Sequence, residues 1–233
     1  MDLFFMSNEI LWFIFIAVDL SLSVVAFFIW GKYGVYVMVA TGTIICNLQV
    51  MKTVKMFGLV ATLGNVVYAS IFFNTDILSE VYGKKEARKA VWMGFYALVA
   101  ATVAMQFAVR FKPDTSDIIQ PHLEAIFNFM PRVVFASLTA YLVSQHHDIW
   151  AFHLWKKVTQ GRWLWLRNNL STMASQLIDT SVFTFLAFWG VFSSSVFWQI
   201  FITTYLFKWI IAALDTPFLY LARWVYHRRE KTD

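Results

Sequence analysis

Two carboxylates in an apolar segment are the first residues of this sequence that could do chemistry. Asp76 and Glu80 are four residues apart, so on a helix their side chains share one face. A carboxylate in hydrocarbon costs roughly 2.5 to 3.5 kcal/mol on insertion scales. The pair must therefore face a polar interior, a bound ligand or a partner charge, which makes it a candidate binding site.

Other apolar segments also carry polar side chains, mostly at helical spacing. They are Asn65 and Asn74 beside the first pair; Arg132, Ser137, Tyr141, Ser144, Gln145 and Asp148; Thr172, Gln176, Asp179 and Phe183; and Lys208 with Asp215. The charges of the acidic and basic side chains within these apolar segments come near to balance. This favours ion pairs between them, because a buried ion without a partner costs far more free energy than a paired one. Bundle-stabilising salt bridges and a ligand site therefore both remain open.

We predict a gating or ion-pair role for Arg132, Lys208 and Asp215, and a substrate-binding role for Asp76, Glu80, Gln176 and Asp179. Carboxylates accept hydrogen bonds from N–H groups, and amides both donate and accept. Aromatic rings offer stacking faces. This combination suits a flat, nitrogen-rich heterocycle better than a sugar or an inorganic ion.

Sequence motifs for catalysis are missing. There is no HExxH sequence, Gly-rich phosphate loop or nucleophile elbow, so we expect no enzyme, metal site or cofactor. His146, His147 and His153 are expected at a helix end and in a loop, as a solvated surface. Because an ATP-binding motif is also missing, active transport would need an ion gradient or a separate energising subunit.

Composition places the chain in the membrane. Of its 233 residues 59% are hydrophobic and 14% are charged, and the mean hydropathy is +0.59. The net charge of +5 does not indicate a nucleic-acid partner, because the basic residues fall in short loops. The single cysteine, Cys46, excludes a disulfide framework within the chain. We predict an all-α integral membrane protein in contact with the lipid bilayer.

About 20 apolar residues span a bilayer, and this rule predicts seven helices. They cover roughly residues 9–30, 33–52, 63–83, 88–110, 122–145, 165–189 and 195–223. Residues 51–64 are expected to form a short connection or a re-entrant segment. The first helix carries Asp19 near its middle, for which we favour a structural or assembly role over one in transport.

The cations predict the orientation, because Lys and Arg are retained on the cytoplasmic side. With the N-terminus outside, thirteen of the 19 Lys and Arg residues lie in the cytoplasm and four outside, while Arg132 and Lys208 lie within helices. The C-terminus is then cytoplasmic.

Four stretches of the chain resemble the queuosine precursor transporter family, also called the vitamin uptake transporter group. They run from about Asn47 to Tyr220 and include TDILSEVYGKKEAR, SQLIDT and KWIIAALDTPFLY. The resemblance implies a bacterial inner-membrane importer of 7-deazaguanines such as preQ0, preQ1 or queuine. It also implies a six-helix core similar to the substrate-binding subunits of energy-coupling-factor transporters, here with an extra N-terminal helix.

By position, the family motifs fall on Thr75, Asp76 and Glu80, on Ser175, Gln176, Asp179 and Thr180, on Arg132, on Asn168 or Asn169, and on Lys208, Asp215, Thr216 and Pro217. We expect Asp179 or Glu80 to accept from the ring N–H and the exocyclic amine, and Gln176 or an asparagine such as Asn65 to contact the ring carbonyl. Phe72, Tyr141 and Phe183 would stack on the base. Asp76 either responds to protons or holds Arg132 or Lys208.

The expected organisation is an extra helix over residues 1–31, a transporter core over 32–226 and a cytoplasmic tail over 227–233, with a homodimer as a further expectation. The favoured function is secondary import of queuosine precursors. One alternative is a substrate-capture subunit for another heterocycle or vitamin that needs an energising complex. A second is a membrane enzyme or a scaffold whose buried charges serve assembly.

Overall fold

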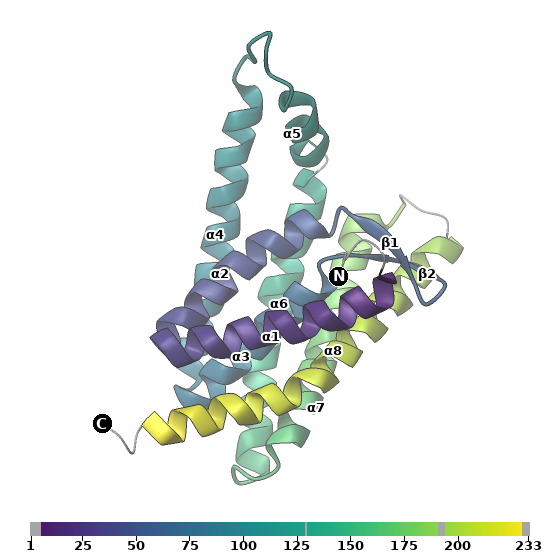
Figure 1. Cartoon of the computed structure of the whole chain (residues 1–233). Coiled ribbons are helices and arrows are strands. Elements are labelled where there is room, and N and C mark those ends of the chain that lie inside the picture. Colours follow the sequence, from purple (N-terminus) through teal and green to yellow (C-terminus); the bar gives the residue numbers. More distant parts are fainter. Residues whose placement is uncertain (1–5, 129, 191–193, 230–233) are drawn as a thin grey trace.

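The computed structural model describes residues 6–128, 130–190 and 194–229, and most of them are helical (Figure 1). The helices are α1 (Asn8–Trp30), α2 (Lys32–Gln49), α3 (Asn65–Val81), α4 (Lys84–Arg110), α5 (Gln120–Phe127), α6 (Met130–Val158), α7 (Leu164–Phe188) and α8 (Ser194–Arg229). Two short strands, β1 (Thr53–Met56) and β2 (Leu59–Thr62), interrupt the helical order.

Three helical stretches in the described residues are long and apolar enough to cross a bilayer. They are Asn8–Trp30, Lys84–Arg110 and Phe197–Trp224, and α5 with α6 forms a fourth if the 45° bend between them lies within one span. Large apolar side chains on these helices are exposed, as expected of surfaces that face lipid. The chain is a multi-pass membrane protein.

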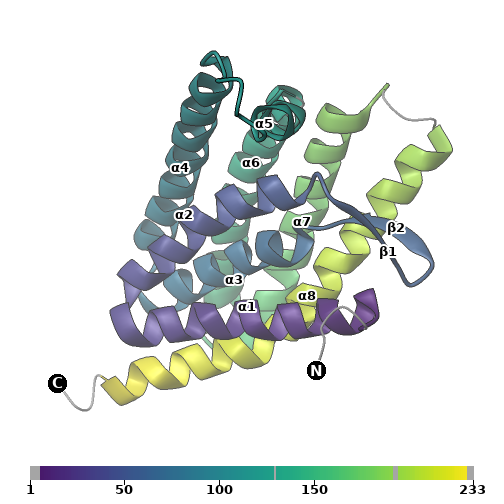
Figure 2. The same ribbon diagram turned by 45° about the horizontal axis from the view of Figure 1, so that its top comes forward.

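Helix α3 is the central helix of the bundle. It packs against α1, α2, α4, α6 and α8, and most of its side chains are buried, including Asn74 and Asp76. Figure 2 shows α3 enclosed by these neighbours. Its polar residues therefore face other helices and not lipid, which is the condition under which ionisable groups are tolerated at this depth.

Residues 51–64 form a β hairpin with antiparallel register, in which Val54 pairs with Ala61 and Met56 with Leu59. Phe57 and Gly58 make the turn with positive φ angles of 50° and 77°, as a two-residue hairpin loop requires. The hairpin is tied to the start of α1, because Asn8 Nδ2 donates to Lys55 O (3.0 Å) and Phe57 N donates to Glu9 Oε1 (2.9 Å).

The hairpin ends at Gly64, which begins α3 in the left-handed region with φ of 90°. A Cβ atom at this position would lie 2.7 Å from the carbonyl oxygen of Cys46 on α2. Glycine thus lets the start of α3 approach the end of α2 closely, and the same corner lines the cavity described below.

Helix α6 differs from the expected fifth span. The expected stretch begins as α5, bends, and then continues to Val158, so His146, His147 and His153 lie within α6 and not in a loop. The polar residues that suggested a loop are tolerated because Gln145 and Asp148 are fully buried against other helices.

The additional first helix, α1, packs against α2, α3 and α8. Its Trp12 Nε1 donates to Asn65 Oδ1 (3.2 Å), and Asn74 Nδ2 donates to Ser23 Oγ on α1 (2.9 Å). Asp19 is buried and faces Ser70 of α3. These contacts anchor α1 to α3, and the structural role of Asp19 stays a prediction.

Candidate functional site

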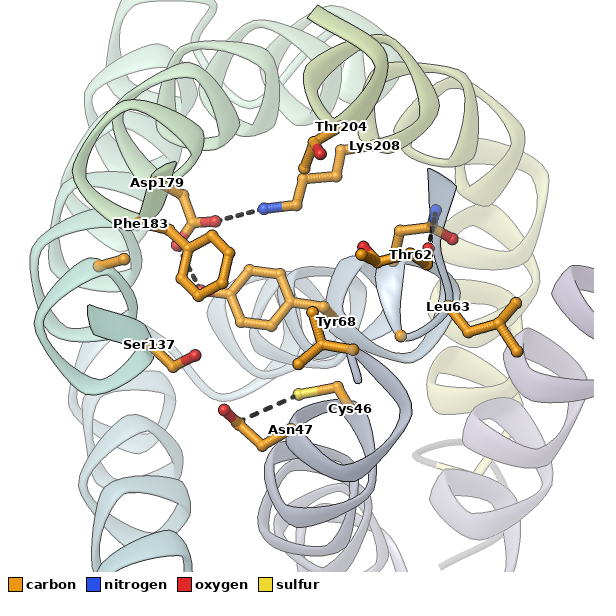
Figure 3. Close-up of a pocket in the computed structure, with 14 residues that line it drawn as sticks. Cys46, Asn47, Thr62, Leu63, Tyr68, Ser137, Asp179, Phe183, Thr204 and Lys208 are labelled. Carbon is orange, nitrogen blue, oxygen red and sulfur yellow. Dashed lines mark hydrogen bonds and ion pairs between the residues drawn. The ribbon is translucent and has the colours of Figure 1, made fainter. Parts of the chain in front are cut away.

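A cavity opens at the hairpin end of the bundle, where α3 begins and α7 ends (Figure 3). The empty space between its lining residues is about 460 Å³, a figure that includes the open mouth. Helices α2, α3, α6, α7 and α8 and the end of β2 contribute to the lining. The polar lining residues are Asn47, Thr62, Asn65, Tyr68, Ser137, Asp179, Thr204 and Lys208.

Asp179 of α7 is the acidic group of this cavity. Its Oδ2 pairs with Lys208 Nζ of α8, and its Oδ1 accepts hydrogen bonds from the Tyr68 hydroxyl of α3 and from Ser144 Oγ of α6 (3.1 Å). Asp179 is 1% exposed and Lys208 is 5% exposed. The carboxylate therefore joins four helices while one side of it borders the cavity.

Lys208 has a second partner in the cavity wall. Its Nζ lies 4.5 Å from the centroid of the Tyr68 ring, a cation–π arrangement. Figure 3 shows Asp179, Lys208 and Tyr68 pointing toward one another across the cavity. Each of the three side chains contacts the other two, and we call them the Asp179–Lys208–Tyr68 cluster.

The aromatic residues divide into two groups. Phe183 lines the cavity, one turn beyond Asp179 on α7. Phe72 and Tyr141 are fully buried behind Tyr68, with ring centroids 5.7 Å and 6.5 Å from the Tyr68 ring. They therefore support the wall and do not form it.

Deeper in the bundle, three carboxylates come from three helices: Asp76 of α3, Asp148 of α6 and Asp215 of α8. Each is at most 1% exposed. Thr172 Oγ1 of α7 donates to Asp76 Oδ2 (3.2 Å), and Asn168 Nδ2 donates to Asp215 Oδ1 (2.9 Å). We call these three residues the acidic layer.

Gln176 lies between the cavity and the acidic layer along α7, one turn from Thr172 and about one turn from Asp179. Its side chain is fully buried, and neither its amide nitrogen nor its carbonyl oxygen has a hydrogen-bond partner. Unpartnered buried polar groups are rare and costly. Gln176 thus carries an unpartnered amide inside the bundle, although it does not line the cavity.

Glu80 lies at the far end of α3 from the cavity. Its carboxylate pairs with Lys156 Nζ of α6 (3.1 Å) and lies 3.6 Å from Arg223 Nη1 of α8, and Lys156 also donates to the Glu80 carbonyl (3.1 Å). We call this set the inner ion-pair cluster. It ties α3, α6 and α8 together at the end opposite the hairpin.

Arg132 also lies outside the cavity and is exposed. Its Nε donates to Leu186 O and its Nη2 to Trp189 O, both at 2.8 Å. These are carbonyls at the C-terminal end of α7, where a cation is favourable. Arg132 thus caps α7 in this conformation.

The cavity brings together five of the residues singled out from the sequence: Asn65, Ser137, Asp179, Phe183 and Lys208. The other predicted site residues do not line it: Asp76 and Asp215 lie in the acidic layer, Glu80 in the inner ion-pair cluster, Gln176 between cavity and layer, Phe72 and Tyr141 behind the wall, and Arg132 at the end of α7. Sequence reasoning missed Tyr68, although its spacing from Asn65 and Phe72 puts it on the same face of α3. The described residues contain no group of three or more His, Cys, Asp or Glu side chains that could hold a metal ion.

Comparison with known proteins places the chain in a family. A family model described as "Putative vitamin uptake transporter" matches residues 62–222. The chain belongs to this family. A Bacillus subtilis (strain 168) protein named "Probable queuosine precursor transporter" is 44% identical over 219 residues, which cover 94% of this chain and 96% of that protein.

More distant relatives carry similar names. The "Queuosine precursor transporter" of Escherichia coli K12 is 26% identical over 170 residues, covering 71% of this chain and 74% of its own length. A "Probable queuosine precursor transporter" of Haemophilus influenzae is 25% identical over 171 residues, covering 72% and 70%. No solved structure matches this chain.

Proposed function

We propose that this chain imports queuosine precursors, 7-deazaguanines such as preQ0, preQ1 or queuine, as a secondary transporter. The family and the names of three relatives support the transport of such compounds. The observation that carries the proposal here is Asp179, a buried carboxylate that borders the cavity and is held by internal partners.

A 7-deazaguanine presents a ring N–H and an exocyclic amine side by side. A carboxylate accepts both in bidentate fashion, and such charge-assisted pairs are the stronger class of hydrogen bond. Asp179 is placed for this contact at the cavity. Asn47 or Asn65 would contact the ring carbonyl, and Phe183 with Tyr68 would flank the ring faces.

In the structure described here, Lys208 occupies one oxygen of Asp179. The arriving base would donate one N–H to that oxygen in place of the lysine and the second to Oδ1 in place of Ser144 Oγ, while the Tyr68 hydroxyl keeps its hydrogen bond. Lys208 would then be released from α7. This exchange links substrate binding to the packing of α7 against α8, because their described ion pair is the one between Asp179 and Lys208.

The orientation proposed here is the one that the distribution of Lys and Arg predicts. With the N-terminus outside, all seven long helices cross the bacterial inner membrane and the cavity opens outward. The inner ion-pair cluster then closes the cytoplasmic end, so this conformation corresponds to an outward-facing state. The homodimer, the similarity of the core to energy-coupling-factor subunits and the three-part division at residues 31 and 226 remain predictions.

Restoration of queuosine in tRNA tests the function. The chain is expressed in a bacterium that can neither make nor import the precursors, and preQ0, preQ1 and queuine are supplied in turn. We expect queuosine to return with at least one precursor and to be lost in Asp179→Asn, while Asp114→Asn in the exposed 111–119 loop retains it. Failure of the wild-type chain with all three precursors, at verified membrane levels, would contradict the proposal.

A further inference from the structure

The acidic layer is not used by the proposed contact between substrate and Asp179. Asp76 and Asp148 are fully buried, and Asp215 is 1% exposed. The Asp148 carboxyl faces the Asp76 carboxyl and the hydroxyls of Ser171 and Thr172. Two carboxylates at close range cannot both be ionised cheaply, since each charge disfavours the other.

No cation balances this layer among the described residues. Their interior lysines and arginines pair elsewhere: Lys208 with Asp179, and Lys156 and Arg223 with Glu80. Hydrogen bonds of normal geometry reach one oxygen of Asp76 and one of Asp215, whereas the second oxygen of each and both oxygens of Asp148 accept none. Three unbalanced charges at this depth would be prohibitively costly.

A second observation comes from two buried amides. Gln145, one turn before Asp148 on α6, accepts a hydrogen bond from Thr75 Oγ1 (3.1 Å), so its side chain reaches α3 beside Asp76. Its Nε2 has no partner, and neither polar atom of Gln176 has one. Both glutamines are fully buried. The layer thus has unpartnered donors and acceptors that continue toward the cavity.

We propose that Asp76, Asp148 and Asp215 bind and release protons during the transport cycle and couple substrate entry to a proton gradient. The inference rests on the proposed import function. A proton from the outer water joins a carboxylate oxygen of the layer and later leaves to the cytoplasm, and no covalent bond of the substrate changes. A proton suits the layer better than a metal ion, because the described residues contain no metal-binding group.

The helices that carry the layer also carry the cavity residues, which provides the coupling. Thr172 and Asp179 lie on one face of α7, and Lys208 and Asp215 lie two turns apart on α8. Release of Lys208 by substrate therefore acts on the two helices that bring Thr172 and Asp215 to the layer. A further titratable group beside the layer is His147 of α6, whose Nδ1 lies 2.8 Å from Ser175 Oγ beside Asp148.

The test uses the purified full chain in sodium-free liposomes with tritiated preQ0 and preQ1 in separate preparations. Exchange of labelled for unlabelled compound at equal pH reports binding and passage without coupling. Accumulation with an exterior one pH unit more acidic than the lumen reports coupling. One coupled proton gives about tenfold accumulation, because one pH unit corresponds to about 1.4 kcal/mol.

We expect Asp148→Asn to keep exchange within about twofold of wild type and to lose the tenfold accumulation. Asparagine has the shape of a protonated carboxyl but cannot release a proton. Asp114→Asn is the matched control. The Ser116 hydroxyl and backbone amide hold the pKa of Asp114 below its ordinary value, so this exposed carboxylate stays charged across the assay.

A pH indicator inside wild-type vesicles gives a second readout that needs no variant, and substrate entry should acidify the lumen. Accumulation by Asp148→Asn equal to wild type would overturn the inference. So would wild-type entry without acidification, or accumulation that appears only in a parallel preparation with an inward sodium gradient. Failure of wild-type exchange would instead contradict the import function, and the coupling with it.

Discussion

Lys208 Nζ lies on Asp179 Oδ2 at the edge of the cavity, and both side chains are almost completely buried. The pair is therefore internal to the binding site and is not a surface salt bridge. Its two members come from α7 and α8, and the Tyr68 ring of α3 covers the lysine. Any ligand that uses Asp179 must compete with a cation already in place.

This relationship predicts strong coupling in stability. Asp179→Asn or Lys208→Met alone leaves one buried charge without its partner, which costs about 3 to 5 kcal/mol. The double variant removes both charges and should unfold close to wild type. Thermal unfolding of the wild type, the two single variants and the double variant in detergent measures this coupling. Single variants that melt with the wild type would show that the pair is not formed in the membrane protein.

Tyr68→Phe removes the hydroxyl that donates to Asp179 Oδ1 but keeps the ring under Lys208. Loss of one such hydrogen bond costs about 0.5 to 1.5 kcal/mol, so we expect preQ0 or preQ1 to bind about twofold to tenfold more weakly. Tyr96→Phe on an exposed part of α4 is the matched control. Equal affinity in both variants would remove Tyr68 from the site.

Gly94 of α4 packs closely against Tyr141, which lies behind the cavity wall. A Cβ atom there would lie 2.6 Å from the Tyr141 hydroxyl oxygen and 2.9 Å from Thr43 Oγ1. Gly94→Ala should therefore destabilise the chain by about 1 to 3 kcal/mol. Gly42→Ala, whose nearest contact would be an ordinary 3.4 Å to Ile71, should be neutral or stabilising. Identical melting of both variants would argue against the close approach of α4.

The orientation can be tested by cysteine labelling in a Cys46→Ser background, since Cys46 is the one cysteine of the sequence. Ser116→Cys in the loop before α5 should react with an impermeant maleimide in intact cells. Lys157→Cys at the end of α6 should react only after permeabilisation. Both positions are exposed in the structure. The reverse pattern would place the N-terminus in the cytoplasm and the cavity on the cytoplasmic side.

Most of the helices can be predicted from the sequence, because the short basic loops between long apolar stretches mark where each helix begins and ends. The stretches expected at 9–30 and 165–189 correspond to α1 and α7 within a residue. The hairpin was not foreseen, since its Lys and Gly residues resemble any polar connection. The length of α6 was underestimated, because Asp148 and the histidines resemble a loop until their buried neighbours are known.

The candidate site was only partly predictable. Asp179, Lys208, Asn65 and Phe183 stand out as polar or aromatic residues at helical spacing, and they share the cavity. Spacing within one helix cannot show which residues of other helices lie opposite. For this reason Glu80 was grouped with Asp76, although its partners Lys156 and Arg223 lie at the far end of the bundle.

Direct binding tests the central claim, that Asp179 in this cavity holds a 7-deazaguanine. Calorimetric titration of the purified chain with preQ0, preQ1 and queuine is compared with the Asp179→Asn, Lys208→Met double variant, which is expected to fold normally. We predict that the wild type binds at least one compound and that the double variant binds it at least about tenfold more weakly, as for a charge-assisted hydrogen bond worth about 1.5 to 3 kcal/mol. Equal affinity of the two proteins, or no binding by the wild type, would contradict the account.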